Sequence, residues 1–283
     1  MKLVRYGMPG TELPGLLDPD GTLRALSPIV ADIDATVLSP AGLRFLAALD
    51  ASKLPAVEGR PRLGAPLGAV REIIAIGLNY RDHATEAGLP IPAEPVVFSK
   101  STSSICGPDD DIRLPAGSVR TDWEVELGIV IGSTTSCVDE EAAWASIAGY
   151  VMVNDVSERD WQMNKGGQWG KGKSFDTFTP IGPWFVSADE AGAPDNLQLS
   201  LTVNGEQRQR GNTQDMIFPV NRIVSYVSQF MTLRGGDLII TGTPAGVGLG
   251  MKPPQFLKAG DVVEQYVTGM GMQTHRVAGG TMR

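Results

Sequence analysis

Three carboxylates in two successive apolar segments could hold a metal ion. A buried strand is predicted over residues 121–132 (TDWEVELGIVIG), with Glu124 and Glu126 near its start. Successive side chains of a strand point to opposite faces, so these glutamates share one face and repel each other unless a positive charge lies between them. Asp155 ends the next apolar run, residues 149–155 (GYVMVND). An all-carboxylate set suits a hard cation, Mg²⁺, Mn²⁺ or Ca²⁺. The alternative is glutamates solvated on an edge strand and an aspartate that caps a helix, and the pattern alone leaves both open.

A histidine and a glutamate three residues apart could act on water. His83 and Glu86 follow a predicted apolar strand within residues 77–88 (GLNYRDHATEAG). One helical turn would place both side chains on the same face, where the pair could abstract a proton. The alternative is a solvated histidine on a surface helix. Residues 81–92 are polar and contain a glycine and two prolines, and we predict that they form a lid that closes over bound substrate.

Two glycine-rich segments could bring polar groups to a site. Residues 164–176 (NKGGQWGKGKSFD) carry Lys165, Lys171 and Lys173 and could form a mobile loop that presents a cation, or a basic connector; they do not match a P-loop. Residues 240–248 (ITGTPAGVG) form a turn after a strand, whose backbone N–H groups could hold a carboxylate, although a plain turn is the more frequent case.

The elements that must position these residues are mostly strands. Apolar and alternating runs recur along the chain, Asp20-Gly21 and Asn204-Gly205 mark hairpin turns, and helices are predicted over residues 39–49 and 220–231. The sequence therefore predicts a mainly β, α+β protein and not a doubly wound nucleotide-binding fold. A Pro/Gly-rich stretch, residues 53–67, is predicted to link a small N-terminal β/α domain (1–66) to a larger domain (67–283).

Composition and charge restrict the classes of function. The 283 residues carry a net charge of −8 without a basic run, so a nucleic-acid or anionic membrane surface is not expected. No stretch is apolar and long enough to span a bilayer, and the N-terminus lacks the apolar core of a secretory signal. Cys106 and Cys137 are the only cysteines, which excludes a thiolate zinc site and is typical of a cytoplasmic protein with reduced thiols.

In this order, seven segments resemble the motif series of the fumarylacetoacetate hydrolase (FAH) family over residues 70–270. They are IGLNYRDHATEAG, PVVFSKSTS, TDWEVELGIVIG, VNDVSERDWQ, GKSFDTFTPIGPW, LTVNGEQRQ and GGDLIITGTPAGVG. The N-terminal segment and the WEVEL and KPPQFLKAGD stretches look most like the branch that includes 2,4-diketo-3-deoxy-L-fuconate hydrolases and proteins labelled ureidoglycolate lyase. The fold that the resemblance implies is a mixed β-sandwich roll, usually assembled as a homodimer.

The resemblance also implies roles for individual residues. Glu124, Glu126 and Asp155 would hold one Mg²⁺ or Mn²⁺, with Ca²⁺ as a substitute in crystals. His83 and Glu86 would activate water, and Lys173 would stabilise developing negative charge. Arg159, Gln162 and Thr243 would orient the substrate carboxylate. His275, near the C-terminus among polar residues, has no predicted role.

The predicted reaction is hydrolysis of a carbon–carbon bond in a 2,4-diketo acid, which yields pyruvate and a second acid. The substrate could be an acylpyruvate or a diketo-deoxy sugar acid. Oxaloacetate decarboxylation, 2-oxo acid isomerisation and ureidoglycolate lyase action are alternatives on the same metal site. A non-catalytic, metal-stabilised β protein is an alternative of another class, which would need neither the H-x-x-E nor the K-S-F motif.

Overall fold

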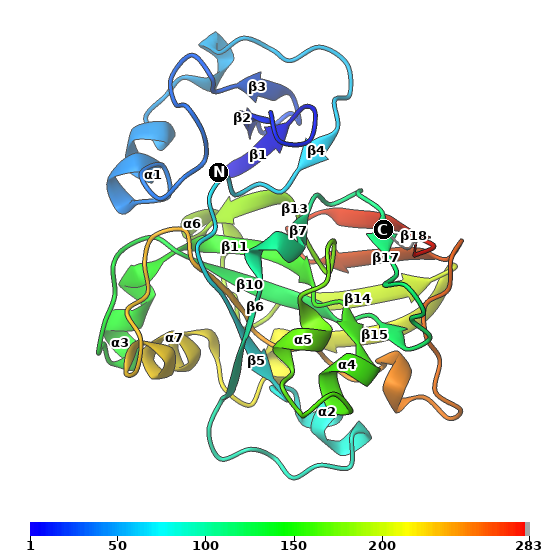
Figure 1. The fold of residues 1–283 in the computed structure, drawn as a ribbon. Helices are drawn as coiled ribbons and strands as arrows, with labels where there is room; N and C mark the ends of the chain where they lie inside the picture. The colour runs from blue at the N-terminus through cyan, green and yellow to red at the C-terminus, as the bar shows by residue number, and fades with distance from the viewer. Residues whose placement is uncertain (281–283) are drawn as a thin grey trace.

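Two large β-sheets and a set of short helices make up the computed structural model, which describes residues 1–280 (Figure 1). The larger sheet has the strand order β3-β2-β1-β13-β11-β10-β16-β5-β6, with β4 beside β1 and β7 beside β13. Its strands are β1 (Lys2–Tyr6), β2 (Leu13–Leu17), β3 (Leu23–Ala25), β4 (Leu63–Gly64), β5 (Ile73–Gly77), β6 (Val96–Lys100), β7 (Ile105–Cys106), β10 (Val125–Ile131), β11 (Ile147–Asn154), β13 (Thr179–Ser187) and β16 (Leu238–Ile240).

The smaller sheet has the order β15-β14-β17-β18-β8, and β9 and β12 form a separate pair. These strands are β8 (Ile112–Arg113), β9 (Thr121–Asp122), β12 (Ser157–Glu158), β14 (Gln198–Val203), β15 (Glu206–Asn212), β17 (Val262–Val267) and β18 (Met272–Ala278). Both sheets mix antiparallel and parallel pairs, since β5 runs parallel to β16 and β8 parallel to β18.

Seven short α-helices and several 3₁₀ turns connect the strands within the described residues. The α-helices are α1 (Pro40–Ala47), α2 (Arg81–Glu86), α3 (Glu140–Ala143), α4 (Arg159–Met163), α5 (Gly170–Lys173), α6 (Ala188–Ala191) and α7 (Val220–Ser228). The 3₁₀ turns are η1 (Ala51–Lys53), η2 (Thr102–Ser104), η3 (Trp144–Ser146), η4 (Thr213–Asp215) and η5 (Gly248–Gly250). Within residues 1–280 no helix has the length and apolar character needed to cross a membrane.

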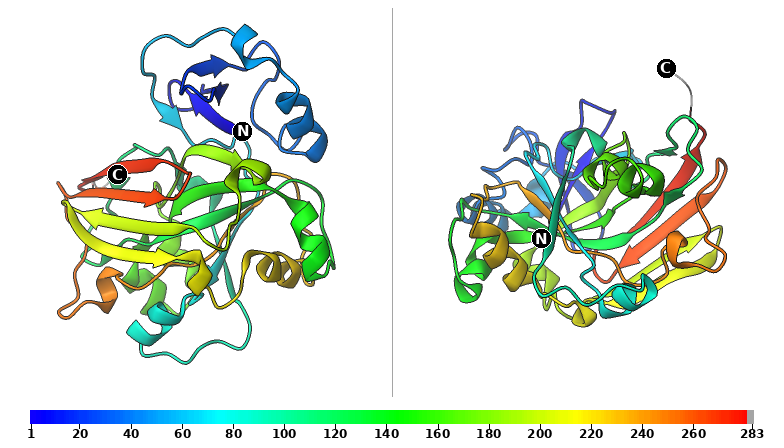
Figure 2. Two further views of the ribbon diagram at one scale, coloured as in Figure 1. Left: turned by 180° about the vertical axis from the view of Figure 1, so that it is seen from behind. Right: turned by 60° about the horizontal axis from the view of Figure 1, so that its bottom comes forward.

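Both faces of β10, in the middle of the larger sheet, are covered, since every residue of this strand is buried. Seen from behind, the smaller sheet lies across the larger one (Figure 2). The core between them takes Val125, Leu127, Ile129 and Ile131 from β10, and Leu199, Leu201 and Val203 from β14. Val130 points to the other face and packs with N-terminal residues such as Leu3, Leu26 and Leu46. The alternation predicted for residues 121–132 is therefore confirmed, but β10 is central and not an edge strand.

The local elements predicted from the sequence form where expected, with one difference. The turns at Asp20-Gly21 and Asn204-Gly205 join the antiparallel pairs β2–β3 and β14–β15. Helix α1 begins after Ser39, whose hydroxyl accepts a hydrogen bond from the Gly42 N–H at 3.0 Å. Helix α7 ends at Ser228, three residues before the predicted end, although its apolar stripe continues to Met231. The mainly β class is confirmed.

The N-terminal part continues the larger sheet. Strand β1 pairs with β13 through Lys2–Val186 and Leu3–Phe185, and it also pairs with β2 and β4. The stretch predicted as a linker, residues 53–67, contributes β4 and buries Ala65 and Leu67 in the N-terminal core. It is a packed segment, because its apolar side chains are needed to cover the sheet. The division into 1–66 and 67–283 stays a prediction.

Candidate active site

Antiparallel pairing of β10 with β11 brings the three predicted metal ligands together. Val125 pairs with Asn154, so Glu124 and Glu126 at the start of β10 meet Asp155 at the end of β11. The Asp155 N–H donates to the Glu124 carbonyl at 2.8 Å, which fixes the two ends against each other. One carboxylate oxygen from each residue lies within 4.8 Å of the other two, and all three side chains are buried. The donor set is all oxygen, as a hard divalent cation requires.

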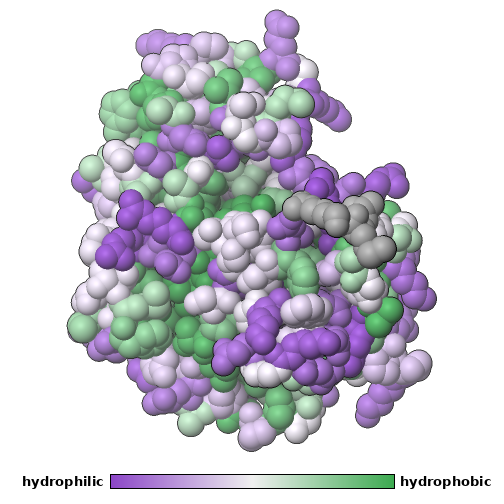
Figure 3. Space-filling model, in the orientation of Figure 1, coloured by the Kyte–Doolittle hydropathy of each residue, from purple (hydrophilic) through white to green (hydrophobic). Residues whose placement is uncertain are grey.

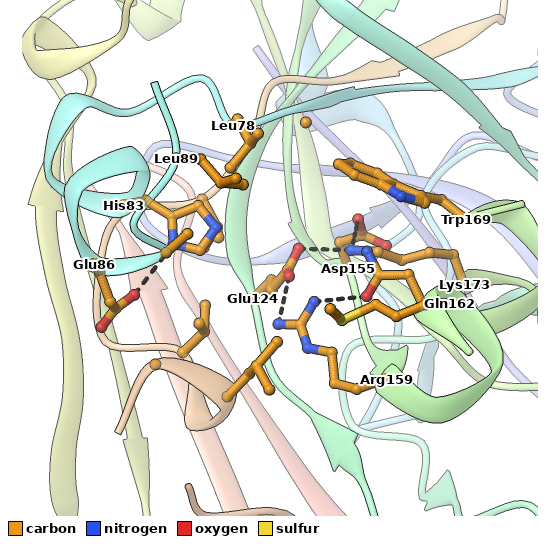
Figure 4. Close-up of a pocket in the computed structure, with 18 of the residues that line it drawn as sticks. Leu78, His83, Glu86, Leu89, Glu124, Asp155, Arg159, Gln162, Trp169 and Lys173 are labelled. Atoms are coloured by element: carbon orange, nitrogen blue, oxygen red, sulfur yellow. Dashed lines mark hydrogen bonds and ion pairs between the residues drawn. The ribbon is translucent and has the colours of Figure 1, made fainter. Parts of the chain in front are cut away.

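Three cations surround this acidic cluster. Lys173 Nζ donates to Glu124 Oε2 at 2.7 Å and to Asp155 Oδ2 at 2.6 Å. Arg159 pairs with the other oxygen of Glu124, Oε1, at 2.7 Å. Lys100 donates to the other oxygen of Asp155, Oδ1. Both oxygens of Glu124 and both oxygens of Asp155 therefore have a lysine or arginine partner, and Figure 4 shows the contacts of Lys173 and Arg159.

Glu126 is the carboxylate that these cations leave uncompensated. Among residues 1–280 no lysine or arginine forms an ion pair with Glu126, and its Oε2 accepts one hydrogen bond, from the Gly242 N–H at 2.8 Å. Burial raises the pKa of Glu126 well above its usual value, and the negative charges of Asp155 and Glu124 raise it further. Burial also acts to raise the pKa of Glu124, but Lys173 and Arg159 outweigh it and lower that pKa to about 2. A divalent cation between the three carboxylates would supply the charge that Glu126 lacks.

Sequence reasoning missed Lys100, the last residue of β6. Its side chain is buried, and Nζ also donates to the Phe178 carbonyl at 2.7 Å. Burial lowers the pKa of Lys100 even though Asp155 acts against that shift. The signal in the sequence was a lysine at the end of the apolar run VVFSK (96–100). Lys100 does not line the cavity, so it contacts Asp155 from the side that faces away from the cavity.

His83 and Glu86 lie across the cavity from the acidic cluster, on α2 (Figure 4). The His83 ring Nδ1 is 3.1 Å from Glu86 Oε2, and Glu86 Oε1 accepts from the Gly246 N–H at 2.9 Å. A carboxylate only accepts hydrogen bonds, so the proton lies on Nδ1 and Nε2 keeps its lone pair. Both side chains line the cavity. The predicted pair therefore exists, with an imidazole oriented as a base.

The three residues predicted to orient the substrate differ in how many of their hydrogen-bond donors are already used within the protein. Arg159 donates to Asp122 Oδ2 at 2.8 Å and to Gln162 Oε1 at 2.9 Å. Gln162 is buried, and its amide Nε2 makes no hydrogen bond within residues 1–280, so it has two donors to offer. The Thr243 hydroxyl donates to the Val125 carbonyl at 2.8 Å and accepts a hydrogen bond from Gln209 Nε2 at 2.7 Å. Thr243 would have to release Val125 before it could donate to a carboxylate.

The nine site residues predicted from the sequence all line one cavity of about 620 Å³. Its walls come from the β5–α2 connection, β6, the ends of β10 and β11, helices α4 and α5, and residues 242–254. The glycine-rich segment 164–176 contributes the buried Lys173 through α5, whereas Lys165 is exposed. Hydrophilic side chains gather over α4 and α5 on the outer surface (Figure 3). His275 is buried elsewhere, with Nδ1 2.8 Å from the Asp110 carbonyl.

Comparison with known proteins points to one family. Residues 72–278 match the family described as Fumarylacetoacetate (FAA) hydrolase C-terminal. A protein of Burkholderia multivorans, named as a hydrolase without a substrate, is 58% identical over 274 residues, which cover 96% of this chain and 97% of that protein.

Solved structures agree over the whole chain. Fumarylacetoacetate hydrolase from the psychrophilic Exiguobacterium antarcticum is 36% identical, with a TM-score of 0.88 and 99% of both chains covered. Maleylpyruvate hydrolase from Sphingobium sp. SYK-6, in complex with manganese(II) ion and pyruvate, is 27% identical, with a TM-score of 0.82, and covers 99% of this chain and 100% of that chain.

Proposed function

The chain belongs to the fumarylacetoacetate hydrolase family, and from that premise we propose that it hydrolyses a carbon–carbon bond in a 2,4-diketo acid to pyruvate and a second acid. The observation that carries the proposal is the arrangement of the cavity. A buried three-carboxylate cluster faces a His83–Glu86 pair whose Nε2 lone pair is free. Support comes also from the structural neighbour named maleylpyruvate hydrolase, which holds manganese(II) and pyruvate.

The acidic cluster is proposed to hold one cation and, through it, the 2-oxo end of the substrate. Mg²⁺ or Mn²⁺ bound by Glu124, Glu126 and Asp155 would act as a Lewis acid on the 2-oxo group. Gln162 and Arg159 would bind the adjacent carboxylate, because their donors lie beside Glu124. This sets the orientation of the diketo acid, with its acyl end directed away from Arg159.

The His83–Glu86 pair is proposed to activate water. Glu86 is anchored by the Gly246 N–H and holds His83 Nδ1, so Nε2 can take a proton from water as the oxygen attacks the C4 carbonyl. The bond between C3 and C4 then breaks, its electron pair stays on C3 as the enolate of pyruvate, and the acyl group leaves as the second acid. C3 then takes up a proton to give pyruvate, which balances the proton that His83 removed from water. Lys173 would donate to the oxygen that becomes negative.

A panel of 2-oxo and 2,4-diketo acids, incubated with Mg²⁺-loaded protein and followed by NMR, tests this proposal. We expect pyruvate to appear from diketo acids. Decarboxylation of oxaloacetate, isomerisation and ureidoglycolate cleavage would use the same cluster, and each gives a different product in the same spectra. Release of no product from any member of the panel would contradict catalysis and favour a metal-stabilised binding protein.

We also propose a cytoplasmic homodimer whose partner molecules are small acids and neither nucleic acid nor membrane. The support is the family resemblance together with the acidic net charge of −8. Light scattering after gel filtration should give twice the chain mass of 30.1 kDa. A monomer mass at all concentrations would contradict the dimer.

Residues 81–92 are expected to become protected when ligand binds. Helix α2 contacts the wall formed by residues 242–254 through the Glu86–Gly246 hydrogen bond and a 3.3 Å bond from the Ala245 N–H to Asp82 Oδ2. A ligand between the two walls would hold them together. Amide hydrogen exchange over 81–92 should slow when oxalate and Mg²⁺ are added. Equal protection with and without ligand would mean that the segment is not a lid.

Replacing Lys100 is expected to weaken cation binding without removing a ligand. Lys100 holds Asp155 Oδ1 and so fixes the orientation of this carboxylate, and loss of such a supporting group typically costs about ten- to a hundredfold in metal affinity. Calorimetric titration of Lys100→Met with Mn²⁺ should show this loss. Lys165→Met is the matched control, because Lys165 is exposed and pairs with Asp160 at 3.5 Å. Unchanged affinity in a folded Lys100→Met protein would leave Lys100 a packing role only.

A further inference from the structure

The part of the cavity that lies away from Arg159 is apolar. Its wall contains Leu78, Leu89, Phe98, Trp169 and Met251. Leu78, Leu89 and Trp169 lie on the opposite side of Glu124 from Arg159 in the close-up (Figure 4). The charged residues that line the cavity are the acidic cluster with Lys173 and Arg159, the His83–Glu86 pair, and Lys252. Lys252 is exposed. We call Leu78, Leu89, Phe98, Trp169 and Met251 the apolar wall.

Trp169 is seated in the apolar wall by a glycine. A Cβ on Gly77, the last residue of β5, would lie 2.5 Å from Cζ3 of Trp169, so the indole packs directly on the strand backbone. The Phe98 ring meets the indole edge-on, with centroids 5.4 Å apart. A Cβ on Gly170 would lie 2.8 Å from the Ser99 carbonyl oxygen, so the start of α5 also packs closely on β6. The indole is therefore ordered in the free protein. Binding of a ligand against the indole then costs little side-chain entropy.

We propose that the apolar wall receives the acyl substituent of the substrate, and that the substrates are 2,4-diketo acids with an alkyl or aryl acyl group and not polyhydroxylated, sugar-derived acids. This inference rests on the proposed function, which places the 2-oxo carboxylate beside Arg159 and directs the acyl end the other way. Hydroxyl groups against the apolar wall would lose water without gaining hydrogen bonds. Trp169 is then the residue that determines the acyl specificity.

Binding of 2-oxo acids that cannot undergo the proposed hydrolysis tests the inference separately from turnover. Pyruvate, 2-oxohexanoate and 2-oxo-4,5,6-trihydroxyhexanoate share the chelating end, and none carries a C4 carbonyl for water to attack. The last two have the same carbon skeleton and differ in three hydroxyl groups. Each methylene buried on the wall should tighten binding about fourfold, so 2-oxohexanoate should bind Mg²⁺-loaded protein more than about tenfold tighter than pyruvate. The trihydroxy acid should bind no tighter than pyruvate.

Variants at two tryptophans locate the effect. Trp169→Ala should remove most of the advantage of 2-oxohexanoate and leave pyruvate affinity unchanged. Trp161→Ala is the matched control, because Trp161 is 43% exposed, packs on Phe175 and does not line the cavity. Trp169→Phe, which keeps an aromatic ring, should retain part of the selectivity and covers the case in which the alanine variant does not fold.

The results separate the inference from the function on which it rests. Wild-type protein that prefers the trihydroxy acid, or a folded Trp169→Ala protein that keeps the tenfold preference, overturns the inference alone. The same holds if Trp169→Ala weakens pyruvate and 2-oxohexanoate equally, since the indole would then be structural. Failure of all three acids to bind in the presence of Mg²⁺ overturns the proposed function and the inference with it.

Discussion

Glu126→Gln is expected to remove cation-dependent turnover while leaving the fold intact. The substitution is isosteric and takes away one of three carboxylate ligands, so divalent cations should bind much more weakly. Lewis-acid activation supplies several kcal/mol of transition-state stabilisation, so hydrolysis should fall by about a thousandfold or more. The metal-free variant should unfold at the same temperature as wild type or higher, because burial disfavours the charged form of this carboxyl.

The measurements are Mn²⁺ titration calorimetry, thermal unfolding and pyruvate release. Glu206→Gln is the matched control, because the Glu206 side chain is 69% exposed and pairs with Arg208 at the surface. Chelation of wild-type protein should have the same effect on turnover, and added Mg²⁺ or Mn²⁺ should restore it. Full activity in protein shown by elemental analysis to be free of metal would contradict the role of the cluster. An unfolded Glu126→Gln protein would mean that the carboxylates are mainly structural.

His83→Ala is expected to separate hydrolysis from reactions that need no water. Loss of a general base typically costs about a hundredfold or more, so cleavage of a diketo acid should fall by at least that factor. Oxaloacetate decarboxylation needs no attacking water, and any such side activity should fall much less. Because His83 contacts Glu86 and none of the cluster carboxylates, the variant should still bind Mn²⁺ and oxalate.

Thr85→Ala is the control for this experiment. Thr85 lies on the same helix and is exposed, and its hydroxyl bonds the Arg81 carbonyl at 2.9 Å outside the cavity. It should change neither reaction. Loss of the cation in His83→Ala would make the histidine a metal ligand. If both reactions survive at wild-type rates, His83 is a surface residue without a part in the chemistry.

The sequence determined the features that depend on neighbouring residues. Alternation in residues 121–132 separated Glu126 from the core residues Leu127 and Ile129, because side-chain direction in a strand changes at every position. Turn residues such as Asn204-Gly205 identified a hairpin, since few residue pairs adopt that backbone conformation. The ordered motifs indicated the family, and the three carboxylates selected by pattern are those that the structure gathers.

Only the tertiary structure decided which distant groups meet. Lys100 binds a carboxylate 55 positions later, and Glu86 is anchored by a backbone N–H 160 positions away. Trp169, at the start of α5, takes its place because Gly77 on β5 has no side chain. These contacts depend on the order of strands in the larger sheet. Glu124 and Glu126 are both buried, but only Glu124 has lysine and arginine partners, so the pKa of Glu124 is lowered and that of Glu126 is raised. Periodicity within a segment carries no information on such pairings, because each is made by two segments that the fold brings together.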